Sequence, residues 1–592
     1  MDLTHRIELT DLSLDVLALI FQNVSALPTA LHIKSHQVQV SRIDLKSLCE
    51  GSKHLYKVAT PYLYKKVVIR CEEGLNPRTL DCEAFSRRPG GFECSFGLAH
   101  VKELAITPRS RDVSGGCCYH LHPLDPPTES DSEGSDFFYN QEGDFDEESF
   151  LRLCEQLQDN TLVAFSYGNL GHSRRSETHS DSWDLATCVP DNILGPRGYL
   201  PEHQRSLESP ALITDFSCER RGDGTNEFDL STFTTLRTLS WIGLRNGDDF
   251  DTLVECLENN ATHLRNLTLD LIDWEETELG MFDEDELDDE INLFADRVTT
   301  PRLHFPALES LSLSEVSFRT AAGAFASTFN FSQLKALRLW NCPGTVELLR
   351  NLTDLHRELP LVSLELVVDI RHADEPMEGA VSRFLQTFSD LRDLFLSVYV
   401  WDWAPIIDVI MNGLRSLKRL VLHGRRVDAD RESEWFEEGA DRCLEWNDQL
   451  SLLFVSAECD VIGIANPPSF MQECLDDISS RISCRMLHLR ASGDELGRTT
   501  GEFYVSREEL YTFAEWAFGP TGIASLEVIA YGDFAFPEIS GERNALLCRR
   551  VDGSSSSSSF QILEEENQAL WEWTQSHMDA LSACAFRTIM TA

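Results

Sequence analysis

The sequence predicts an α/β fold in which a small N-terminal helical module precedes a long solenoid of parallel strands with irregular acidic insertions. Three observations lead to this fold class. Two helical patterns occupy the first 70 residues, a six-residue leucine template recurs after them, and runs with helical periodicity separate its copies. Repeated strand, turn and helix build a solenoid whose neighbouring units bury one continuous core.

The composition limits the classes of function. The chain has 592 residues and a formal net charge of -47. Nucleic-acid binding is driven largely by Lys and Arg that release counterions, so we expect no nucleic-acid partner. The 17 cysteines are odd in number and form no C-x-x-C pair, which is typical of reduced intracellular thiols. No window approaches the roughly 20 apolar residues that span a bilayer and no signal peptide is visible, so we expect a cytoplasmic or nuclear protein without a membrane partner.

The first predicted helix covers residues 12 to 24, LSLDVLALIFQNV, with Ser13 as its N-cap and Asp15 in its first turn. Apolar side chains cover well over half of its circumference, so the helix needs more than one partner surface. An exposed apolar patch of this kind is usually an interaction site. The alternative, that the rest of the same chain covers the helix, stays open on the pattern alone.

A second helix is predicted over residues 45 to 60. Asp44 is placed to cap it and Pro61 to end it, because proline removes a helical hydrogen bond. Its apolar residues recur at steps of three and four on one face, while its lysines lie on another. Residues 1 to 70 have a net charge of +3, whereas the remainder of the chain has -50. The lysines either steer an acidic partner surface or form a solvated helix face.

Together the two patterns resemble an F-box. The resemblance rests on L-S-L-D-V-L-x-x-I-F from Leu12 and D-L-x-x-L-C-x-x-S-K-x-x-Y from Asp44, and A-T-P-Y-L-Y from Ala59 is similar to the form common in fungal F-box proteins. The pattern departs from the family at Ser13, where proline is usual, and in the longer spacer between the helices. In that family the module docks on the Skp-type adaptor of cullin-RING ubiquitin ligases.

The resemblance also implies which side chains face the adaptor. Carried over position by position, they are Leu12, Val16, Leu17, Ile20 and Phe21 on the first helix, and Leu45, Leu48, Cys49 and Ser52 on the second. Burial of each large apolar side chain contributes roughly 1.5 to 3 kcal/mol, so four or five of them support a specific complex after the cost of association.

The template L-x-x-L-x-L predicts the strands of the solenoid. Clear copies begin at residues 236, 264, 308, 334, 361, 391 and 417, and poorer copies begin at 101, 162, 484 and 523. All but one of the spacings between clear copies lie between 26 and 30 residues, which resembles the length of leucine-rich repeats. The exception, 44 residues, contains the acidic stretch 275 to 290, which we interpret as a loop inserted into one repeat.

Helical runs lie between the templates, at 321 to 329, 345 to 359 and 377 to 388. In each template, positions four and six are expected to point into the core, and positions three, five and seven to face outward. Cys342 at the ninth position of one unit resembles the cysteine-containing leucine-rich repeats often paired with F-boxes. Ordinary βα units of a doubly wound domain are the alternative.

Basic residues predict a target-binding strip along the strands. Five of the seven residues at template position two are Lys or Arg in an otherwise acidic region, and Arg suits bidentate recognition of carboxylate or phosphate. We therefore expect an acidic or phosphorylated target protein. The candidate target-binding residues are Arg338, Trp340, Arg392, Phe395, Arg419 and His423. The alternative is that the basic side chains are solvated and pair with nearby Asp and Glu, and that the aromatic ones belong to the core.

The sequence contains no phosphate loop, dinucleotide fingerprint, H-E-x-x-H motif or nucleophile elbow, so we expect no enzymatic activity, no cofactor and no metal site. The segment CCYHLH, residues 117 to 122, has zinc-ligand residue types without the usual spacing. The acidic run at 283 to 290 lacks the glycine and the spacing of an EF-hand loop, which favours a solvated charge run.

The chain divides into five predicted segments. These are an F-box-like module at 8–66, irregular repeats at 67–230 with an acidic insert at 128–149, regular repeats at 231–430, divergent repeats at 431–550, and a serine-rich linker with a tail helix at 551–592. Residues 171 to 210 and the serine run at 554 to 559 are polar and are expected to be flexible. The tail helix, which contains Leu570, Trp571 and Trp573, is expected to cap the end of the solenoid.

The resemblance implies a substrate-recognition subunit of an SCF-type ubiquitin ligase, which binds a Skp-type adaptor and through it a cullin. Its repeats are then expected to recruit a target protein, whose identity the sequence does not reveal. The alternative is a non-ligase interaction scaffold that uses the same F-box-like module and repeats.

Overall fold

The computed structural model describes the repeats in most detail. The described residues are 53–70, 100–107, 157, 159, 161–167, 189, 191–214, 228–244, 247–271, 303–319, 321–355, 358–368, 377–398, 400, 402–424, 448–490, 507–535, 544–550 and 558–584. The predicted first helix, the CCYHLH segment and the acidic stretches 128–149 and 275–290 lie outside these ranges.

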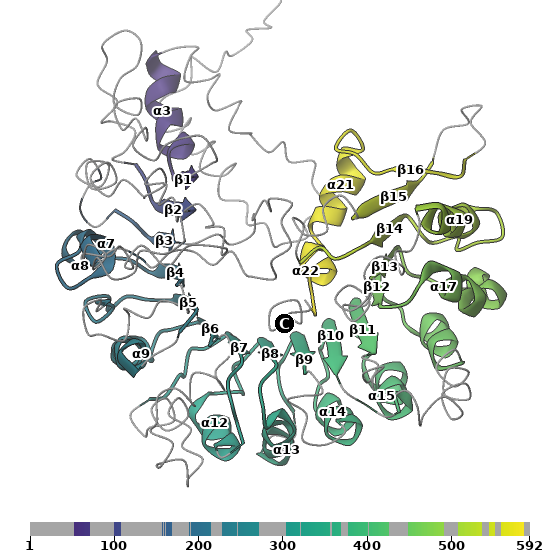
Figure 1. The fold of residues 1–592 in the computed structure, drawn as a ribbon, viewed down its shortest axis with the longest axis horizontal. Helices are drawn as coiled ribbons and strands as arrows, with labels where there is room; N and C mark the ends of the chain where they lie inside the picture. The colour runs from purple at the N-terminus through teal and green to yellow at the C-terminus, as the bar shows by residue number, and fades with distance from the viewer. Residues whose placement is uncertain are drawn as a thin grey trace, which may run out of the picture. The chain divides into compact units, whose positions relative to one another are not determined.

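The chain forms two compact units. Unit 1 comprises Met1–Leu170 and Asp184–Asn260, and unit 2 comprises Gly171–Trp183 and Ala261–Ala592. Within each unit the described strands are hydrogen-bonded to their neighbours in sequence, so the order of strands in the sheet follows the order of the chain (Figure 1).

Parallel strands form the described part of unit 1. Its strands are β1 (Lys66–Arg70), β2 (Glu103–Thr107), β3 (Ala164–Tyr167), β4 (Ser209–Ile213) and β5 (Thr238–Ile242). Its helices are α3 (Lys53–Leu63), α7 (Asp191–Leu194), α8 (Tyr199–His203) and α9 (Gly247–Asn260). The poorer leucine templates at 101 and 162 therefore do mark strands.

Helix α3 corrects the predicted end of the second helix. Pro61 lies inside α3, which continues to Leu63 instead of stopping at residue 60. The helix is held on both sides of the proline, because the hydroxyl of Thr60 donates to the carbonyl of Tyr56 at 2.5 Å and the backbone N–H of Tyr64 donates to the carbonyl of Thr60 at 3.0 Å. Burial of Leu55, Val58 and Ala59 supplies the packing that outweighs the lost hydrogen bond.

The prediction that residues 171 to 210 are flexible is wrong for 191 to 210, which form α7, α8 and the start of β4. Gln204 explains much of this order. Its Oε1 accepts hydrogen bonds from the backbone N–H groups of Thr161 and Leu162 at 3.1 and 3.0 Å, and its Nε2 donates to the hydroxyl of Tyr199 at 2.7 Å. A buried amide with these partners stabilises polar sequence in a way that composition does not show.

Unit 2 carries the long run of repeats. Its parallel strands are β6 (Asn266–Asp270), β7 (Ser310–Ser314), β8 (Ala336–Trp340), β9 (Ser363–Val367), β10 (Asp393–Val398), β11 (Arg419–Gly424), β12 (Val461–Ile464), β13 (Met486–Leu489) and β14 (Val528–Tyr531). Its helices are α12 (Ala322–Thr328), α13 (Thr345–Leu355), α14 (Glu378–Leu385), α15 (Ala404–Gly413), α17 (Pro468–Leu475), the 3-10 helix η8 (Asp476–Arg481), α19 (Arg507–Phe518), α21 (Gln568–Gln575) and α22 (Met578–Leu581).

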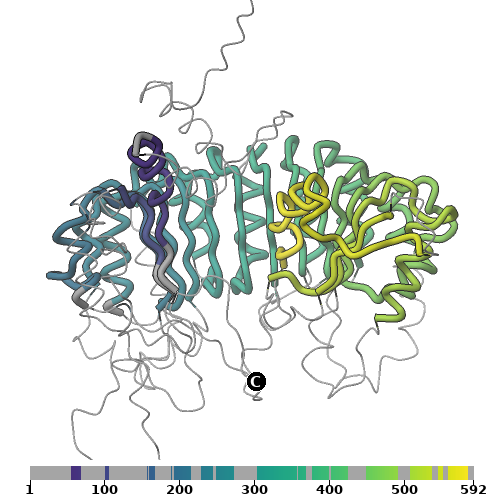
Figure 2. Tube along the Cα trace, turned by 90° about the horizontal axis from the view of Figure 1, so that it is seen from above, coloured from purple at the N-terminus to yellow at the C-terminus, as the bar shows by residue number. Residues whose placement is uncertain are grey.

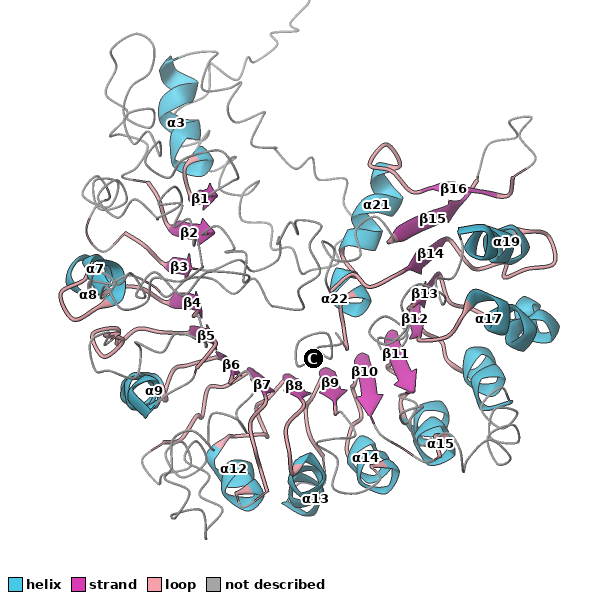
Figure 3. Cartoon of the chain, viewed as in Figure 1, coloured by secondary structure: helices cyan, strands magenta, loops and turns pink. Residues whose placement is uncertain are grey.

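In unit 2, helices α12 to α19 cover one face of the strands, and α22 lies on the other face (Figure 3). The three helical runs predicted between the templates correspond to α12, α13 and α14. A doubly wound domain would carry helices on both faces of a sheet whose strand order reverses. The sequential strand order therefore confirms a parallel-stranded solenoid and excludes the doubly wound alternative.

The leucines of the template form the core of the repeats. Positions four and six point inward as predicted, and position one does so as well. All three positions are at most 4% exposed in the clear copies, with Trp241 in place of leucine at one of them. Burial of each such side chain contributes roughly 1.5 to 3 kcal/mol, so the ladder of leucines is the main stabilising feature of the sheet.

Template position eight ends the strand through a positive backbone φ. Gly243, Glu315 and Asn341 occupy this position in three units and have φ values of 87°, 59° and 49°. The side chain of Asn341 donates from Nδ2 to Oε1 of Glu315 at 3.1 Å, which joins two of these turns. Cys342 follows directly, and its buried thiol lies 3.5 Å from the carbonyl oxygen of Leu313. The predicted ninth-position cysteine is therefore part of the turn.

Two details of the repeat register differ from the sequence prediction. Strand β12 has no leucine template and was not expected, since its sequence is VIGI. In β14, Val528 is aligned with Met486, so this unit begins at Leu526 and not at residue 523. By contrast, β6 pairs directly with β7, so the two templates on either side of the acidic stretch form adjacent strands, as the insertion interpretation requires.

The last two strands, β15 (Ala545–Arg549) and β16 (Phe560–Ile562), are antiparallel. Arg549 secures this end of the sheet, because its guanidinium donates to the carbonyls of Phe518 and Ile523 at 2.9 and 2.7 Å. The end of the serine run is also fixed. The backbone N–H and the hydroxyl of Ser559 donate to Oε2 of Glu515 at 2.8 and 2.7 Å, so the expectation of a flexible linker is wrong there.

Candidate protein-interaction surfaces

The nine predicted adaptor-facing residues, Leu12 to Ser52, lie outside the described residues, and their role stays a prediction. The described continuation of the module is α3, which leads through Tyr64 and Lys65 directly into β1. Lys57 is exposed, whereas Lys65 and Lys66 lie 3.8 and 3.9 Å from the carboxylate of Glu103. Of the lysines on the predicted helix, the structure thus describes the exposure of Lys57 only, and their role toward a partner stays a prediction.

Several of the basic residues at template position two form ion pairs with glutamates of the adjacent repeats. Arg265 and Lys335 both reach Glu309, at 3.7 and 2.7 Å, and Arg237 reaches Glu208 at 3.3 Å. The hydrogen bond from Lys335 holds the pKa of Glu309 below its usual range. At these positions the basic side chains are solvated and paired with Glu, which is the alternative to the predicted target-binding strip. Exposed pairs of this kind contribute little to stability.

Arg392 differs from the rest of this row. Its side chain is exposed directly before β10, and among the described residues no ion pair to it is found. Of the predicted target-binding residues it is the one whose guanidinium remains open to a ligand.

Arg338 and Trp340 converge on a buried carboxylate. Nε of Arg338 lies 2.8 Å from Oε2 of Glu365, and Nε1 of Trp340 donates to Oε1 of the same residue at 2.9 Å. The guanidinium of Arg338 also lies over the Trp340 ring, 5.4 Å from its centroid. Glu365 is only 2% exposed; its Oε1 accepts a hydrogen bond, whereas its Oε2 has the nearby guanidinium of Arg338 but no hydrogen bond among the described residues.

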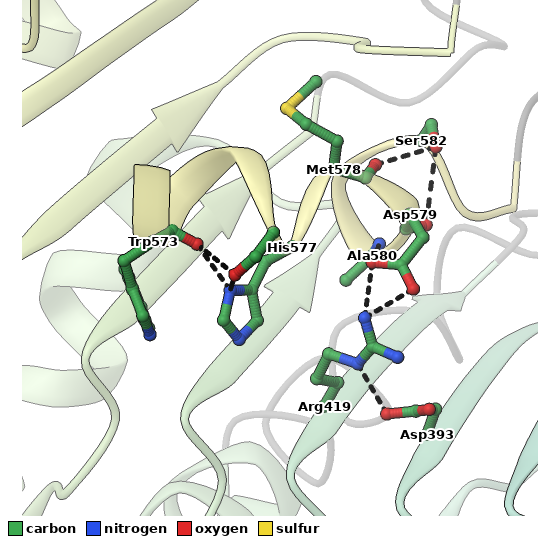
Figure 4. Close-up of polar contacts among 9 residues, drawn as sticks. Asp393, Arg419, Trp573, His577, Met578, Asp579, Ala580 and Ser582 are labelled. Atoms are coloured by element: carbon green, nitrogen blue, oxygen red, sulfur yellow. Dashed lines mark hydrogen bonds and ion pairs between the residues drawn. The ribbon is translucent and has the colours of Figure 1, made fainter. Parts of the chain in front are cut away.

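Arg419 lies between two aspartates. Its Nε donates to Asp393 at 2.5 Å, and its Nη1 donates to both carboxylate oxygens of Asp579 (Figure 4). Burial by itself would lower the pKa of Arg419, but the two carboxylates outweigh it and keep the pKa above its ordinary value. The guanidinium also approaches the ring of Phe395, 5.9 Å from the centroid. Arg419 therefore binds a carboxylate, and this carboxylate belongs to the chain itself.

The residues that bury this region come from the C-terminal segment, which we define as residues 568 to 584. It contains α21 and α22 and lies across the strands of unit 2 (Figure 2). Ala580, Leu581, Ala583 and Cys584 are at most 1% exposed, and they pack in one cluster with outward-facing side chains of the strands. These strand residues are Val367, Phe395, Val421, Val461, Met486, Val528 and Ala530.

Two further arginines, outside the set of predicted target-binding residues, hold the C-terminal segment. Nη1 of Arg490 donates to the carbonyls of Ala583 and Cys584 at 2.7 and 2.8 Å, and Arg490 itself is 3% exposed. Arg485 lies over the ring of Trp573, 4.2 Å from its centroid, while it pairs with Glu527 through two hydrogen bonds of 3.1 and 2.8 Å.

A signal for this cover was present in the sequence. Outward positions of a solvated sheet are polar, yet in β10 to β14 many of them are Phe, Val, Met or Ala. The predicted tail helix exists as α21, but it belongs to a segment that covers the strand face instead of the end of the solenoid. Phe395, 3% exposed, packs in the same cluster as the segment, so a target reaches it only if the segment moves, and His423 is also buried, at 6% exposed.

The described residues contain no group of three or more His, Cys, Asp or Glu that could hold a metal ion. Seven described cysteines are free and buried, and burial raises the pKa of Cys256, Cys459 and Cys484 to about 12. Such thiols are poor nucleophiles at neutral pH. Among the same residues, no helix is both long enough and apolar enough to span a membrane.

Comparison of the sequence with family models and with curated proteins finds no match. Among solved structures, the chain is similar to the crystal structure of the Rad7 and Elc1 complex in yeast. The two chains share 12% sequence identity with a TM-score of 0.35, and the match covers 81% of this chain and 88% of the other. A likeness at this level assigns neither a function nor a partner.

Proposed function

We propose that the chain is a substrate-recognition subunit of an SCF-type cullin-RING ubiquitin ligase, which acts in the cytoplasm or the nucleus. The observation that carries the proposal is the succession of an F-box-like sequence in residues 12 to 56 and a parallel repeat sheet that begins at once with β1. Such a chain performs no bond chemistry. It raises the local concentration of a target near a ubiquitin-loaded enzyme.

In this proposal the two parts of the chain have different roles. The F-box-like module docks on a Skp-type adaptor and through it on a cullin, and the repeats recruit an acidic or phosphorylated target. The exposed guanidinium of Arg392 supports a contact with such a target. A non-ligase scaffold, built from the same module and repeats, is the second candidate.

Co-purification with the Skp-type adaptor tests the docking step. Wild type is expected to retain the adaptor, and a variant with Leu17→Ala and Phe21→Ala is expected to lose it, because two large apolar side chains leave the interface. A matched control replaces two exposed leucines, Leu355→Ala and Leu452→Ala, whose side chains are 60% and 56% exposed. Failure of wild type to bind the adaptor contradicts the proposal.

Deletion of residues 8 to 66 separates a ligase from a scaffold. If the chain directs its target to ubiquitination, a protein that binds the repeats accumulates in cells that carry the deletion. A scaffold predicts unchanged turnover of every bound protein, measured after protein synthesis is stopped.

A further inference from the structure

The C-terminal segment lies on the strand face of unit 2 in the way a peptide ligand lies on a receptor. Asp579 and Arg419 meet although 160 positions separate them in the sequence. Helices α21 and α22 have eight and four residues, lengths at which isolated helices are not stable in water. The conformation of the segment therefore depends on the surface beneath it.

Three polar anchors on the strand face hold three different groups of the segment. Arg419 binds the carboxylate of Asp579, Arg490 binds two backbone carbonyls, and Oε1 of Glu365 accepts the backbone N–H of Cys584 at 2.8 Å. The second and third anchors contact main-chain atoms, so they do not select a sequence. Selectivity comes from Arg419, which requires an acid, and from the apolar strand residues, which accept small side chains such as Ala580.

The edges of the contact remain open to solvent. The side chain of Asp579 is 52% exposed, and residues 564 to 566, which connect the segment to β16, are exposed as well. A half-exposed ion pair exchanges partners more readily than a fully buried one, because water and competing carboxylates reach it. A tether this short gives the segment an effective concentration in the millimolar range.

We propose that the strand face of β9 to β14 binds a short helical protein segment that presents one carboxylate followed by small apolar residues. The C-terminal segment is the copy of this ligand that the chain itself carries, and it covers the site until such a partner displaces it. This inference rests on the proposed function, since the partner is the recruited target. Two observations define the partner's chemistry: the charge of Arg419, and the C-terminal segment that is bound to the surface.

A full-length chain with a protease site inserted between Glu565 and Glu566 tests the exchange. After cleavage, a fluorescent peptide of residues 566 to 592 is expected to replace the bound segment and to bind with saturation. An Asp579→Asn peptide is expected to bind about tenfold more weakly, because a charge-assisted hydrogen bond to Arg419 is lost. A Glu572→Gln peptide is the matched control and is expected to bind like wild type, since Glu572 is exposed and pairs within its own helix.

An Arg419→Gln chain completes a double-mutant cycle between Arg419 of the chain and Asp579 of the peptide. In this chain the wild-type and Asp579→Asn peptides are expected to bind within about twofold of each other, because the partner of the carboxylate is gone. Three outcomes would each overturn the proposal. The chain loses its fold on cleavage, or it stays folded but its segment never exchanges, or the Asp579→Asn peptide binds the wild-type chain as tightly as the wild-type peptide does. The segment would then be a fixed part of the core.

Hydrogen exchange of the uncut, full-length chain provides a measurement that does not depend on cleavage. Amides of residues 568 to 584 are expected to exchange at least about tenfold faster than those of β10 to β13, since the segment opens while the sheet stays folded. Equal protection overturns the proposal. A chain that binds the adaptor while its segment does not exchange contradicts only this inference, and a chain that exchanges the segment but fails to bind the adaptor contradicts only the F-box function.

Discussion

At the scale of single residues, the turns of the repeats depend on backbone conformations that few side chains adopt. Position eight of the template has positive φ in three units, and in one of them the residue is a glycine, Gly243. An added Cβ there would lie 2.1 Å from the carbonyl oxygen of Thr214. Asn341 tolerates the same conformation because asparagine visits the left-handed region more readily than most residues.

We expect Gly243→Ala to lower the free energy of unfolding by more than about 1 kcal/mol, because both the positive φ and the contact with Thr214 oppose a Cβ. Urea denaturation followed by circular dichroism measures the change. The matched control is Gly379→Ala in α14, where no atom lies within 4 Å of the added Cβ. This control is expected to be neutral or slightly stabilising. Equal behaviour of the two variants contradicts the assignment of the turn.

Buried histidine makes the stability depend on pH. Burial lowers the pKa of His488 from 6.5 to about 4, and its Nε2 lies 2.9 Å from the carbonyl oxygen of Gly532. Burial also lowers the pKa of His577. The unfolded chain therefore binds more protons than the folded chain below pH 6.5, so stability falls as the pH drops from 6.5 toward 4.

We expect His488→Gln to remove a large part of this acid sensitivity, on the order of 3 kcal/mol for a group of this kind. The measurement is the difference in unfolding free energy between pH 7 and pH 4.5, compared with wild type. The matched control is His304→Gln, the same substitution at an exposed position. A His488→Gln variant with the wild-type slope contradicts the role of burial.

At the scale of elements, each helix contributes through the face that it turns to the strands. In α13, Leu349 is fully buried, whereas Leu355 at the end of the same helix is 60% exposed. The adjacent helices α12, α13 and α14 contact one another in sequence, so each helix packs between its neighbours and the sheet. This amphipathic pattern is the reason that the helical runs were recognisable from their periodicity.

We expect Leu349→Ala to cost about 2 to 5 kcal/mol of unfolding free energy, because it removes core contacts and leaves a cavity. Leu355→Ala, the same substitution six positions later in the helix, is expected to change the value by less than about 0.5 kcal/mol. Thermal or urea unfolding measures both. Comparable losses in the two variants would show that α13 does not pack as described.

At the scale of the whole chain, the strands of unit 2 form a row in which each strand pairs with the one before it and the one after it. Strand β8 pairs with β7 and β9, and Leu337 at its centre is 2% exposed. In such an architecture stability is approximately a sum of local terms and nearest-neighbour terms. Damage to one repeat is therefore expected to remain local.

We expect Leu337→Ala to speed amide exchange in β7, β8 and β9, while β13 and β14 keep their protection. Hydrogen exchange detected by mass spectrometry resolves these segments, and the Leu355→Ala chain serves as the control. A uniform increase across unit 2 would instead indicate one cooperative unit and would contradict a row of nearest-neighbour contacts.

The sequence by itself determined the repeat and the fold class, an α/β solenoid of parallel strands. Leucine at fixed template positions specifies which side chains enter the core, and the spacing of the templates specifies parallel strands joined by helices, because both are local and periodic properties. Strand β12 and the start of the unit at Leu526 escaped recognition since their core side chains do not follow the template. The order around Gln204 escaped recognition because it depends on hydrogen bonds between residues more than 40 positions apart.

Only the tertiary structure decided whether the predicted target-binding residues are exposed or covered. Template positions predicted that Arg419, Phe395 and His423 face away from the core, and they do, but a local pattern contains no information about what covers that face. For Arg419 and Phe395 the cover comes from Asp579 and its neighbours, which lie about 160 positions further along the chain. The apolar outward positions of β10 to β14 indicate that this face is covered, but the segment that covers it is determined by chain folding and by the complementarity of two surfaces distant in sequence.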